Sequence, residues 1–171
     1  MRMIFLHTAV FLWILCGVSA QYRNVALQGR ATQSSILTLV DHGYQSLAIN
    51  AVDGNQDSYF YHSSCSHTNN DLSPWWRVDL LKPYRITYIS ITNRGDCCAE
   101  RLNGAEILVG NSLTNNGNSN ARCGVVTSIP AGSTQNFFCH GMVGRYVNII
   151  LRDKREYLQL CEVQVWTADR H

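Results

Sequence analysis

The stretch RGDCCAERL, from Arg94 to Leu102, brings together two arginines, a carboxylate and two adjacent cysteines. His67 lies twenty-seven positions before Arg94, and Arg101 lies seven positions after it. Arginine presents a planar fork of N–H donors, and an imidazole adds a further polar nitrogen. If two loops bring these three side chains together, they match the vicinal hydroxyls and ring oxygen of a sugar. A lone histidine is more commonly structural, so the joint spacing carries this prediction.

The same stretch has two other interpretations. Arg94-Gly95-Asp96 matches an adhesion tripeptide, but that use needs a mobile, exposed segment, and a three-residue match is weakly specific. A redox pair is normally spaced as Cys-x-x-Cys, unlike Cys97 and Cys98. Successive Cα atoms lie about 3.8 Å apart, below the roughly 4.4 Å that disulfides usually span, so a bond between these neighbours would be strained. Such strain persists mainly where function enforces it.

A second polar segment, NAVDGNQDS from Asn50 to Ser58, supplies several oxygen donors within one glycine-containing turn. Hard cations such as Ca²⁺ prefer oxygen ligands of this kind. The segment departs from EF-hand spacing and has no glutamate at the twelfth position, which excludes that module. Because Asn and Asp also favour turns without any metal, a solvated turn is the alternative.

Short β-strands are expected to position these residues. The segments that are rich in Ile, Val, Tyr and Trp and that largely alternate with polar residues are 75–80, 85–93, 105–110, 145–151 and 158–166. Clusters of Gly, Asn, Ser and Pro separate them, notably at 110–120, and no helical period extends beyond a couple of turns. The pattern predicts an all-β fold, an antiparallel β-sandwich or jelly-roll barrel, with the site on short loops at one end.

The first twenty residues have the features of a secretory signal peptide: Arg2, an apolar run over 4–18 and small residues up to Ala20. The run is too short and wrongly flanked for a membrane anchor. We therefore expect cleavage before Gln21 and a secreted, extracellular protein without membrane insertion. Residues 21–171 would form a single domain with its own core.

Cysteine usage fits that compartment. Removal of the signal peptide eliminates Cys16 and leaves Cys65, Cys97, Cys98, Cys123, Cys139 and Cys161. An even number in an oxidising compartment suggests three disulfides, for which six cysteines allow about fifteen pairings.

The charges are nearly balanced, with 14 Lys and Arg against 12 Asp and Glu. This balance gives no reason to propose nucleic acid or an anionic membrane as a partner. Twelve of the basic residues are arginine, whose planar fork suits bidentate recognition of polar ligands better than lysine does.

The spacing His-x26-Arg-x-Asp-x4-Arg resembles the motif of the F-type lectins, the fucolectin family, and is met at His67, Arg94, Asp96 and Arg101. The resemblance extends over nearly the whole chain after the signal peptide. It includes NVALQGRATQSS (24–35), AVDGN (51–55), PWWRVDL (74–80) and CEVQVW (161–166). These segments also resemble the wider discoidin-like group of β-barrel or jelly-roll domains, to which that family belongs.

The resemblance implies a fucose site. His67, Arg94 and Arg101 would hydrogen-bond the ring oxygen and hydroxyls, while Asp96 would orient the arginines. It also implies a vicinal disulfide, Cys97–Cys98, whose flat sulfur face packs on the sugar ring. The pocket for the C6 methyl group would be lined by His42, Phe60 and Tyr61.

The resemblance further implies the remaining disulfides, Cys65–Cys161 and Cys123–Cys139, and a structural calcium ion. The residues implied as calcium ligands, several through backbone carbonyls, are Asn50, Asp53, Asn55, Ser64, Cys161 and Glu162. The ion would tie the turn near Asp53 to the C-terminal strand.

These expectations together predict a secreted, non-catalytic lectin for terminal L-fucose on glycans, with a role in innate recognition of fucosylated surfaces. One shallow site gives modest affinity, so a homo-oligomer is the expected route to avidity. The alternative is a discoidin-like adhesion module that binds protein or phospholipid, which would not need the complete set of His67, Arg94 and Arg101. An enzyme is disfavoured because no nucleophile motif or paired carboxylates stand out.

Overall fold

The computed structural model describes residues 21–39 and 44–168, so the expected signal peptide and His42 lie outside the described residues. The strands are β1 (Tyr22–Asn24), β2 (Arg30–Gln33), β3 (Thr38–Leu39), β4 (Tyr44–Gln45), β5 (Ser66–His67), β6 (Asp71–Leu72), β7 (Trp75–Thr92), β8 (Glu106–Gly110), β9 (Ala121–Val125), β10 (Thr134–Ile150), β11 (Arg155–Glu156), β12 (Gln159–Leu160) and β13 (Glu162–Ala168). The 3-10 helices are η1 (Ala26–Gln28), η3 (Ala48–Val52), η4 (Phe60–His62), η5 (Ala99–Leu102) and η6 (Thr114–Gly117). Within this part of the chain, no helix is long and apolar enough to cross a membrane.

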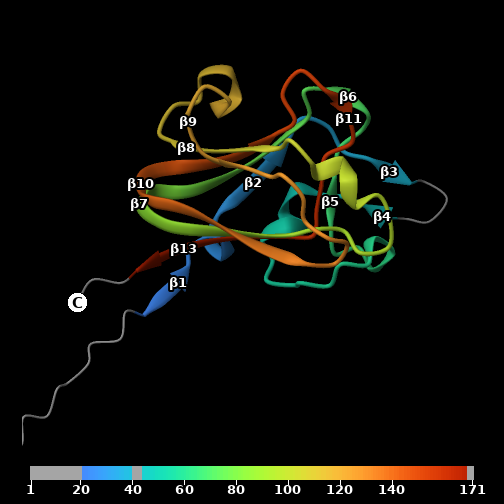
Figure 1. The fold of residues 1–171 in the computed structure, drawn as a ribbon, viewed down its shortest axis with the longest axis horizontal. Helices are drawn as coiled ribbons and strands as arrows, with labels where there is room; N and C mark the ends of the chain where they lie inside the picture. The colour runs from blue at the N-terminus through green and yellow to red at the C-terminus, as the bar shows by residue number, and fades with distance from the viewer. Residues whose placement is uncertain (1–20, 40–43, 169–171) are drawn as a thin grey trace, which may run out of the picture.

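The main sheet is antiparallel and folds over on itself. Its strand order is β1-β13-β7-β10-β8-β9, and β2 pairs with the first part of β7. The central strands are long, 18 residues in β7 and 17 in β10. One half of this pair adjoins β2 and β8, and the other half adjoins β13, so both strands run through the two layers (Figure 1). The expected antiparallel β-sandwich is confirmed. Over the described residues, the sheet does not close into a barrel.

Irregular backbone positions allow the long strands to bend. The register between β10 and β7 shifts between Phe138 and Met142 and again between Gly144 and Tyr146. A bulge of this kind kinks a strand and strengthens its twist. Gly144 also admits no side chain, because a Cβ there would lie 2.6 Å from the backbone nitrogen of Gly110. The neighbouring strands can therefore pack closely where the sheet turns.

One apolar core fills the space between the layers. Trp76 and Val78 of β7 and Val163 and Val165 of β13 are buried there, in the alternation that strands with one buried face require. The indole nitrogen of Trp76 donates a hydrogen bond to the carbonyl of Ala48 at 2.9 Å. This bond fastens η3, and the loops that follow it, to the sheet.

The predicted strands were correct in type but not in extent. The expected strands at 75–80 and 85–93 form one continuous strand, β7, and 145–151 is only the second half of β10. The first half of β10 contains His140 and Gly141, both at positive φ, and this irregularity hid its alternation. The expected strand at 158–166 divides at Cys161 into β12 and β13.

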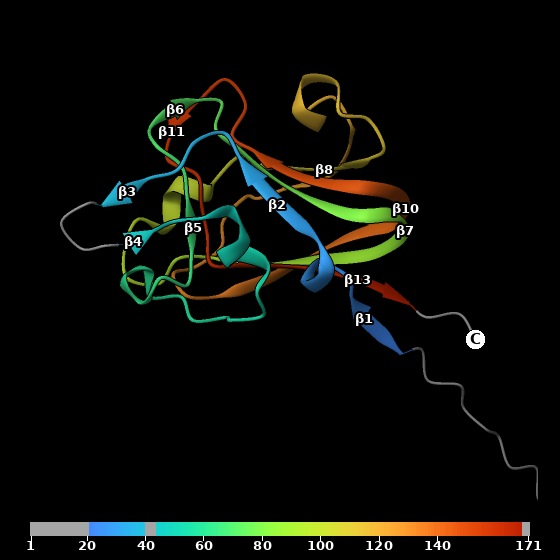
Figure 2. The same ribbon diagram turned by 180° about the vertical axis from the view of Figure 1, so that it is seen from behind.

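The short elements gather at one end of the sandwich. The pairs β3–β4, β5–β12 and β6–β11 lie there with η4 and η5, whereas β1 and the C-terminal end of β13 lie at the other end (Figure 2). The short pairs bring segments together that are distant in the sequence, since β5 pairs with β12 through His67 and Gln159. This end carries the residues singled out by spacing.

Candidate carbohydrate-binding site

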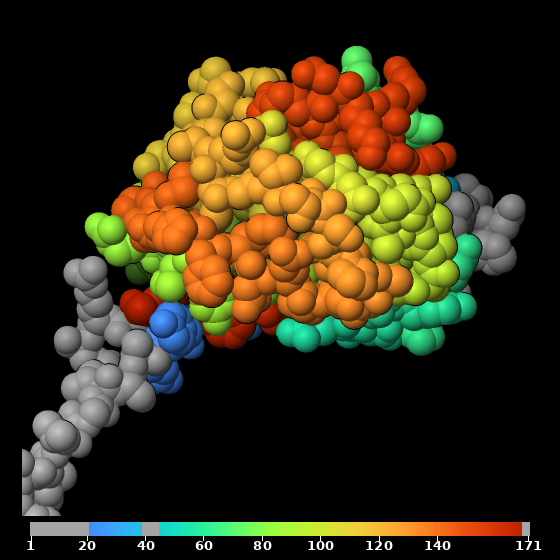
Figure 3. Space-filling view, in the orientation of Figure 1, coloured from blue at the N-terminus to red at the C-terminus, as the bar shows by residue number. Residues whose placement is uncertain are grey.

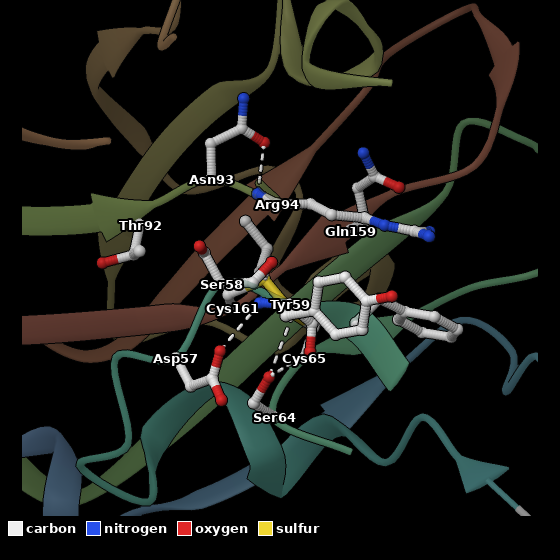
Figure 4. Close-up of a disulfide and its surroundings, with 12 residues drawn as sticks. Asp57, Ser58, Tyr59, Ser64, Cys65, Thr92, Asn93, Arg94, Gln159 and Cys161 are labelled. Atoms are coloured by element: carbon white, nitrogen blue, oxygen red, sulfur yellow. Dashed lines mark hydrogen bonds between the residues drawn. A yellow bond between two sulfur atoms is a disulfide. The ribbon is translucent and has the colours of Figure 1, made fainter. Parts of the chain in front are cut away.

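The described residues contain three disulfides, and their pairing is the one that the resemblance implied. They are Cys65–Cys161, Cys97–Cys98 and Cys123–Cys139. The first joins positions 96 residues apart and holds the start of β5 against the start of β13. It lies beside Ser58, Tyr59 and Ser64, where the hydroxyl of Ser64 donates to the carbonyl of Tyr59 at 3.0 Å (Figure 4). The loop that leads into His67 is thereby fixed to the C-terminal strand.

His67 is a buried, neutral hydrogen-bonding group. The side chain is in β5, the residue is 2% exposed, and Nδ1 lies 2.8 Å from the carbonyl oxygen of Thr68. Burial, together with the positive charges of Arg94 and Arg101, lowers the pKa of His67 to about 4, although hydrogen bonds with Thr68 and Gln159 oppose this shift. Since the carbonyl can only accept, Nδ1 carries the proton and Nε2 is left as an acceptor. The site therefore presents one acceptor nitrogen near physiological pH.

Arg94 is held rigidly by Asp96. Its Nε donates to Oδ1 at 2.9 Å and its Nη2 to Oδ2 at 2.6 Å, and both side chains are less than 10% exposed. Burial raises the pKa of Asp96, but the bonds from Arg94 and from the amide of Phe60 outweigh it and keep that pKa below its usual value. Because one edge of the guanidinium is engaged, the other N–H groups remain for a ligand.

Arg101 comes from η5 and is oriented by the last residue of β11 and the residue that follows it. Its Nε lies 3.6 Å from Oε1 of Glu156, and its guanidinium carbon lies 4.6 Å from the centroid of the Tyr157 ring. The yellow-green surface around residue 100 borders the orange-red surface of the 152–157 segment (Figure 3). A charge partner and a stacked ring thus fix the second guanidinium.

Two aromatic rings connect His67 to both arginines. The Phe60 ring centroid lies 5.3 Å from that of His67 and 4.3 Å from the guanidinium carbon of Arg94. On the other side, the ring of Tyr157 lies 5.4 Å from His67 and also stacks on Arg101. The predicted trio is therefore brought together, with the imidazole between two cationic forks.

The backbone between the arginines is constrained at several points. Cys98 has a φ of 60°, in the left-handed region, and η5 begins at the next residue. The side-chain amide of Gln159 donates a hydrogen bond to the carbonyl of Cys98 at 2.8 Å, and the side-chain amide of Asn93 donates one to the carbonyl of Ala99 at 3.0 Å. These bonds hold the vicinal disulfide and Arg101 in a fixed position relative to Arg94.

The Arg-Gly-Asp tripeptide is part of this rigid wall. A Cβ at Gly95 would lie 2.5 Å from the hydroxyl of Ser58, and the Gly95 amide donates to the Ser58 carbonyl at 2.8 Å. Glycine is needed here for close approach. The charged side chains of Arg94 and Asp96 bind each other rather than solvent, so the tripeptide is not displayed as a mobile adhesion motif.

Two of the three residues expected to line the methyl pocket can be located. Phe60 is 3% exposed and packs against both Arg94 and His67, whereas Tyr61 is 42% exposed, with its ring 5.9 Å from the guanidinium carbon of Arg94. Both belong to η4, beside the site. His42 falls among residues that the structure does not describe, and its role stays a prediction.

The expected calcium ligands include a carboxylate in need of a partner. Glu162 is fully buried, and neither carboxylate oxygen makes a well-formed hydrogen bond among the described residues. Burial, with the charge of Asp53, raises the pKa of Glu162 to about 8, and the nearby backbone N–H of Gly54 opposes this shift only in part. A buried carboxylate without a partner is costly, and a cation would remove that cost.

Other contacts hold several of the remaining expected ligands in place. The carboxylate of Asp53 accepts a hydrogen bond from the backbone N–H of Asn55 at 2.8 Å. The side-chain amide of Asn50 donates one to the carbonyl of Ser63 at 3.0 Å. The Cys65–Cys161 bond joins the segment containing Ser64 to the start of β13. In the described part of the chain, no group of three His, Cys, Asp or Glu side chains is arranged to hold a metal, so backbone and amide oxygens would have to contribute. The donor set is compatible with a hard cation.

Sequence reasoning missed three residues that support the site. Glu156 and Tyr157 orient Arg101, and Gln159 holds Cys98 and faces His67 across the β5–β12 pair. Gln159 lies within the predicted strand 158–166, and Glu156 and Tyr157 lie just before it. Their roles depend on the pairing of β11 with β6 and of β12 with β5, across more than eighty residues, which no local pattern indicates.

Comparison with known proteins gives consistent relatives. A family model described as the NedA-like, galactose-binding domain matches residues 50–149. Fucolectin-6 of Anguilla japonica is 55% identical over 143 residues, which cover 83% of this chain and 74% of that protein.

Solved structures agree with this result. A fucolectin from the serum of striped bass, Morone saxatilis, superposes with a TM-score of 0.80 and 49% identity over 87% of this chain; the match spans only about half, 48%, of the bass chain. A fucose-binding module of Streptococcus pneumoniae has a TM-score of 0.72 and 28% identity, covering 86% of this chain and 99% of the module. The chain belongs to the fucolectin family, the F-type lectins, within the wider group of discoidin-like, galactose-binding domains.

Proposed function

We propose that this protein is a secreted, non-catalytic lectin that binds terminal L-fucose on glycans. The observation that carries this proposal is the neutral His67, which presents an acceptor nitrogen between two guanidinium forks. A pyranose offers hydroxyls that both donate and accept and a ring oxygen that only accepts. Two cationic donors and one acceptor complement that pattern.

The apolar parts of fucose would meet the remaining walls. The ring face would pack on the sulfur atoms of Cys97 and Cys98, and the C6 methyl group would lie toward Phe60 and Tyr61. Rigid, desolvated walls reduce the entropy lost on binding, and directed hydrogen bonds select the sugar.

We also propose that calcium binds at Glu162 and Asp53, together with Asn50, Asn55, Ser64 and the carbonyl of Cys161. Bound calcium would supply positive charge that compensates the buried carboxylate. Through the Cys65–Cys161 bond, the same residues stabilise the loop that carries His67. Calcium would thus act on loop stability and not contact the sugar.

Avidity and biological role follow from the size of the site. A monosaccharide offers few contacts, and its hydroxyls lose water on binding, so one site has modest affinity. Self-association would place several sites on one particle, as recognition of fucosylated microbial or host surfaces in innate immunity requires. The three disulfides fit an extracellular location.

The relatives favour this function over an adhesion module or an enzyme. A protein-binding or lipid-binding discoidin-like domain has no use for the connected set of His67, Arg94 and Arg101. Oxidation of Cys97 and Cys98 removes both vicinal thiols as nucleophiles.

The proposal is tested with Arg101→Ala, because Arg101 is partly exposed and its removal leaves the fold intact. Losing its bonds to the sugar costs about 1 to 3 kcal/mol each, so retention on a fucose resin is expected to disappear. Arg122→Ala is the matched control, since Arg122 is an exposed arginine on β9 whose Nη1 lies 3.6 Å from Oε1 of Glu106. Equal retention of both variants would disprove the assignment.

At Arg94, the substitution must keep the positive charge beside Asp96. Arg94→Ala would leave the carboxylate of Asp96 buried without its partner, which destabilises a protein by several kcal/mol. Arg94→Lys keeps the charge but loses the bidentate geometry, so it is expected to weaken fucose binding with a smaller change in melting temperature.

A further inference from the structure

A large hollow in the described structure lies away from the fucose site. It has a volume of about 610 Å³, and its walls come from the start of β1, the middle of β7, the bulge of β10 and the end of β13. The residues that line it include Arg23, Tyr84, Arg85, Phe138, His140 and Thr167. We propose that this hollow is a second ligand site, which binds the oxyanion of a sulfated or phosphorylated saccharide. The inference is independent of the proposed fucose function.

Arginine side chains line this hollow, and no acidic side chain among the lining residues balances their charge. Arg23, Arg85 and His140 all face the hollow, and none of its lining residues is acidic. No ion pair joins Arg23 or Arg85 to a carboxylate among the described residues, although arginines elsewhere, such as Arg145 with Asp79, do form such pairs. The whole chain carries a net charge of only +2, so this concentration of positive charge is local. An anionic group is the ligand chemistry that complements it.

The bulge in β10 orients part of this lining. His140 and Gly141 have φ values of 50° and 77°, within the register shift between Phe138 and Met142. The carbonyl of Gly141 accepts a hydrogen bond from Nη1 of Arg85 at 3.0 Å. That bond fixes the guanidinium and leaves its other N–H groups for a ligand. A bulge is a common means of redirecting side chains at a binding surface.

Aromatic side chains indicate that the anion is attached to a sugar. Phe138 is 60% exposed at the edge of the hollow, which is unusual for so large an apolar side chain. The guanidinium carbon of Arg23 lies 5.9 Å from the ring centroid of Tyr84, and Nζ of Lys82 lies 5.3 Å from it. An exposed ring can pack on the C–H face of a pyranose while the cations bind its sulfate or phosphate group.

The shape of the hollow favours a small ligand. Sites for small molecules usually enclose about 300–1,000 Å³, and this hollow lies within that range. A flat bilayer or a nucleic acid duplex would instead require an extended basic surface, which the balanced composition does not provide. One or two sugar units with an ester oxyanion fit better.

The two sites share β7 but lie on different parts of the sandwich. Thr87 lines the hollow in the middle of β7, and Arg94 follows the end of that strand, seven residues further along the chain, which would span roughly 23 Å if fully extended. Thr167 lines the hollow near the end of β13, and Figure 1 shows β1 and the end of β13 far from β3 and β4. One ligand should therefore bind without affecting the other.

The test uses calorimetric titration of the mature chain with three probes in low-salt buffer. The probes are a sulfated heparin disaccharide, the same disaccharide after desulfation, and mannose 6-phosphate. We expect binding of the sulfated or the phosphorylated probe and none of the desulfated one. The tighter of the two identifies the source of the oxyanion, and either result supports the site.

Variants locate the binding. Arg23→Gln and Arg85→Gln are each expected to weaken it about tenfold or more, because each removes a charge-assisted bond. Arg122→Ala removes the same charge elsewhere and is expected to leave it unchanged. Retention on a fucose resin should be normal for all three variants.

Three results would overturn the proposal. They are the absence of binding by both anionic probes, equal weakening by Arg122→Ala and Arg85→Gln, and unchanged affinity in Arg23→Gln and Arg85→Gln. Equal weakening would reduce the effect to overall charge, and unchanged affinity would show that the probe binds elsewhere. Loss of fucose retention in Arg85→Gln would disprove the independence of the two sites.

Discussion

The protonation state of His67 gives a sharp test of the fucose site. Burial, followed by the charges of Arg94 and Arg101, holds the pKa of this imidazole at about 4. We expect the neutral form to bind fucose, because its Nε2 accepts a sugar hydroxyl. Protonation would turn that acceptor into a donor and add a third cation between the two arginines. Fucose affinity should therefore fall only when the pH approaches 4.

The size of the effect separates this site from one with an ordinary histidine. With a pKa of about 4, roughly 97% of His67 is neutral at pH 5.5, so affinity should barely change between pH 7.5 and 5.5. With an unperturbed pKa of about 6.5, only about 9% would be neutral at pH 5.5, and affinity would fall roughly tenfold. Below pH 4, affinity should decrease about tenfold per pH unit, since one proton must then leave His67 for binding.

The same pKa predicts a loss of stability in acid. The unfolded chain takes up a proton near pH 6.5, and the folded chain does so only near pH 4, so the unfolded state binds more protons between these values. Stability therefore falls as the pH decreases from 6.5 to 4, by about 3 kcal/mol in total from this group. Circular dichroism at each pH must accompany the binding measurement to confirm that the domain is folded.

Calorimetric titration with L-fucose at pH 7.5, 6.5, 5.5 and 4.5 provides the measurement. His67→Gln supplies the control, because a glutamine oxygen accepts a hydrogen bond but does not titrate. Its affinity should be weaker than that of the wild type and independent of pH over this range. A wild-type midpoint near pH 6.5 would refute the assignment of His67 as a buried, neutral acceptor.

Three further predictions concern the disulfides and the cation. Replacing Cys97 and Cys98 with serine should weaken fucose binding yet leave the urea midpoint nearly unchanged, because a bond between neighbours closes almost no loop; unchanged affinity would remove the sulfur face from the site. Cys65→Ser should instead lower the unfolding free energy by about 4 kcal/mol, since its bond to Cys161 closes a loop of nearly a hundred residues, and a small shift of the urea midpoint would contradict this. Calcium should raise the melting temperature of the wild type but not that of Glu162→Gln. In chelator, Glu162→Gln should melt at a higher temperature than the wild type, because the variant removes an unpaired buried carboxylate. Equal stabilisation of both proteins by calcium would exclude Glu162 as a ligand.

Local patterns predicted the layers of this fold better than its connections. Alternation in 75–80 and 85–93 indicated two strands, but in the structure one strand, β7, runs through both and through Pro83 between them. It includes a residue in the left-handed region, Leu81. Proline cannot donate to a ladder, yet it is tolerated where the pairing is interrupted. Continuity of β7 results from the packing of both halves against one core, which no local pattern encodes.

The fucose site divides in the same way between local and distant information. Arg94, Asp96 and Arg101 belong to one loop, where a fixed spacing translates directly into a bidentate pair and a second fork, and sequence spacing was sufficient. Glu156 ends β11 and Tyr157 follows it, and the segment is placed by the pairing of β11 with β6 and of β12 with β5, strands that are distant in the sequence. Such pairing depends on the register between distant strands, and a change of one residue would turn each side chain to the opposite face.

This division also explains why Arg-Gly-Asp stands beside two cysteines. Gly95 admits the close approach of Ser58, Asp96 fixes Arg94, and Cys98 takes the left-handed conformation from which η5 starts and presents Arg101. Gly95, Asp96 and Cys98 thus each contribute separately to the placement of two guanidinium groups around one buried imidazole. A variant that relaxes the segment at Cys98 without touching a sugar-binding nitrogen should therefore still lose affinity, because the site depends on the distance between the arginines as much as on their presence.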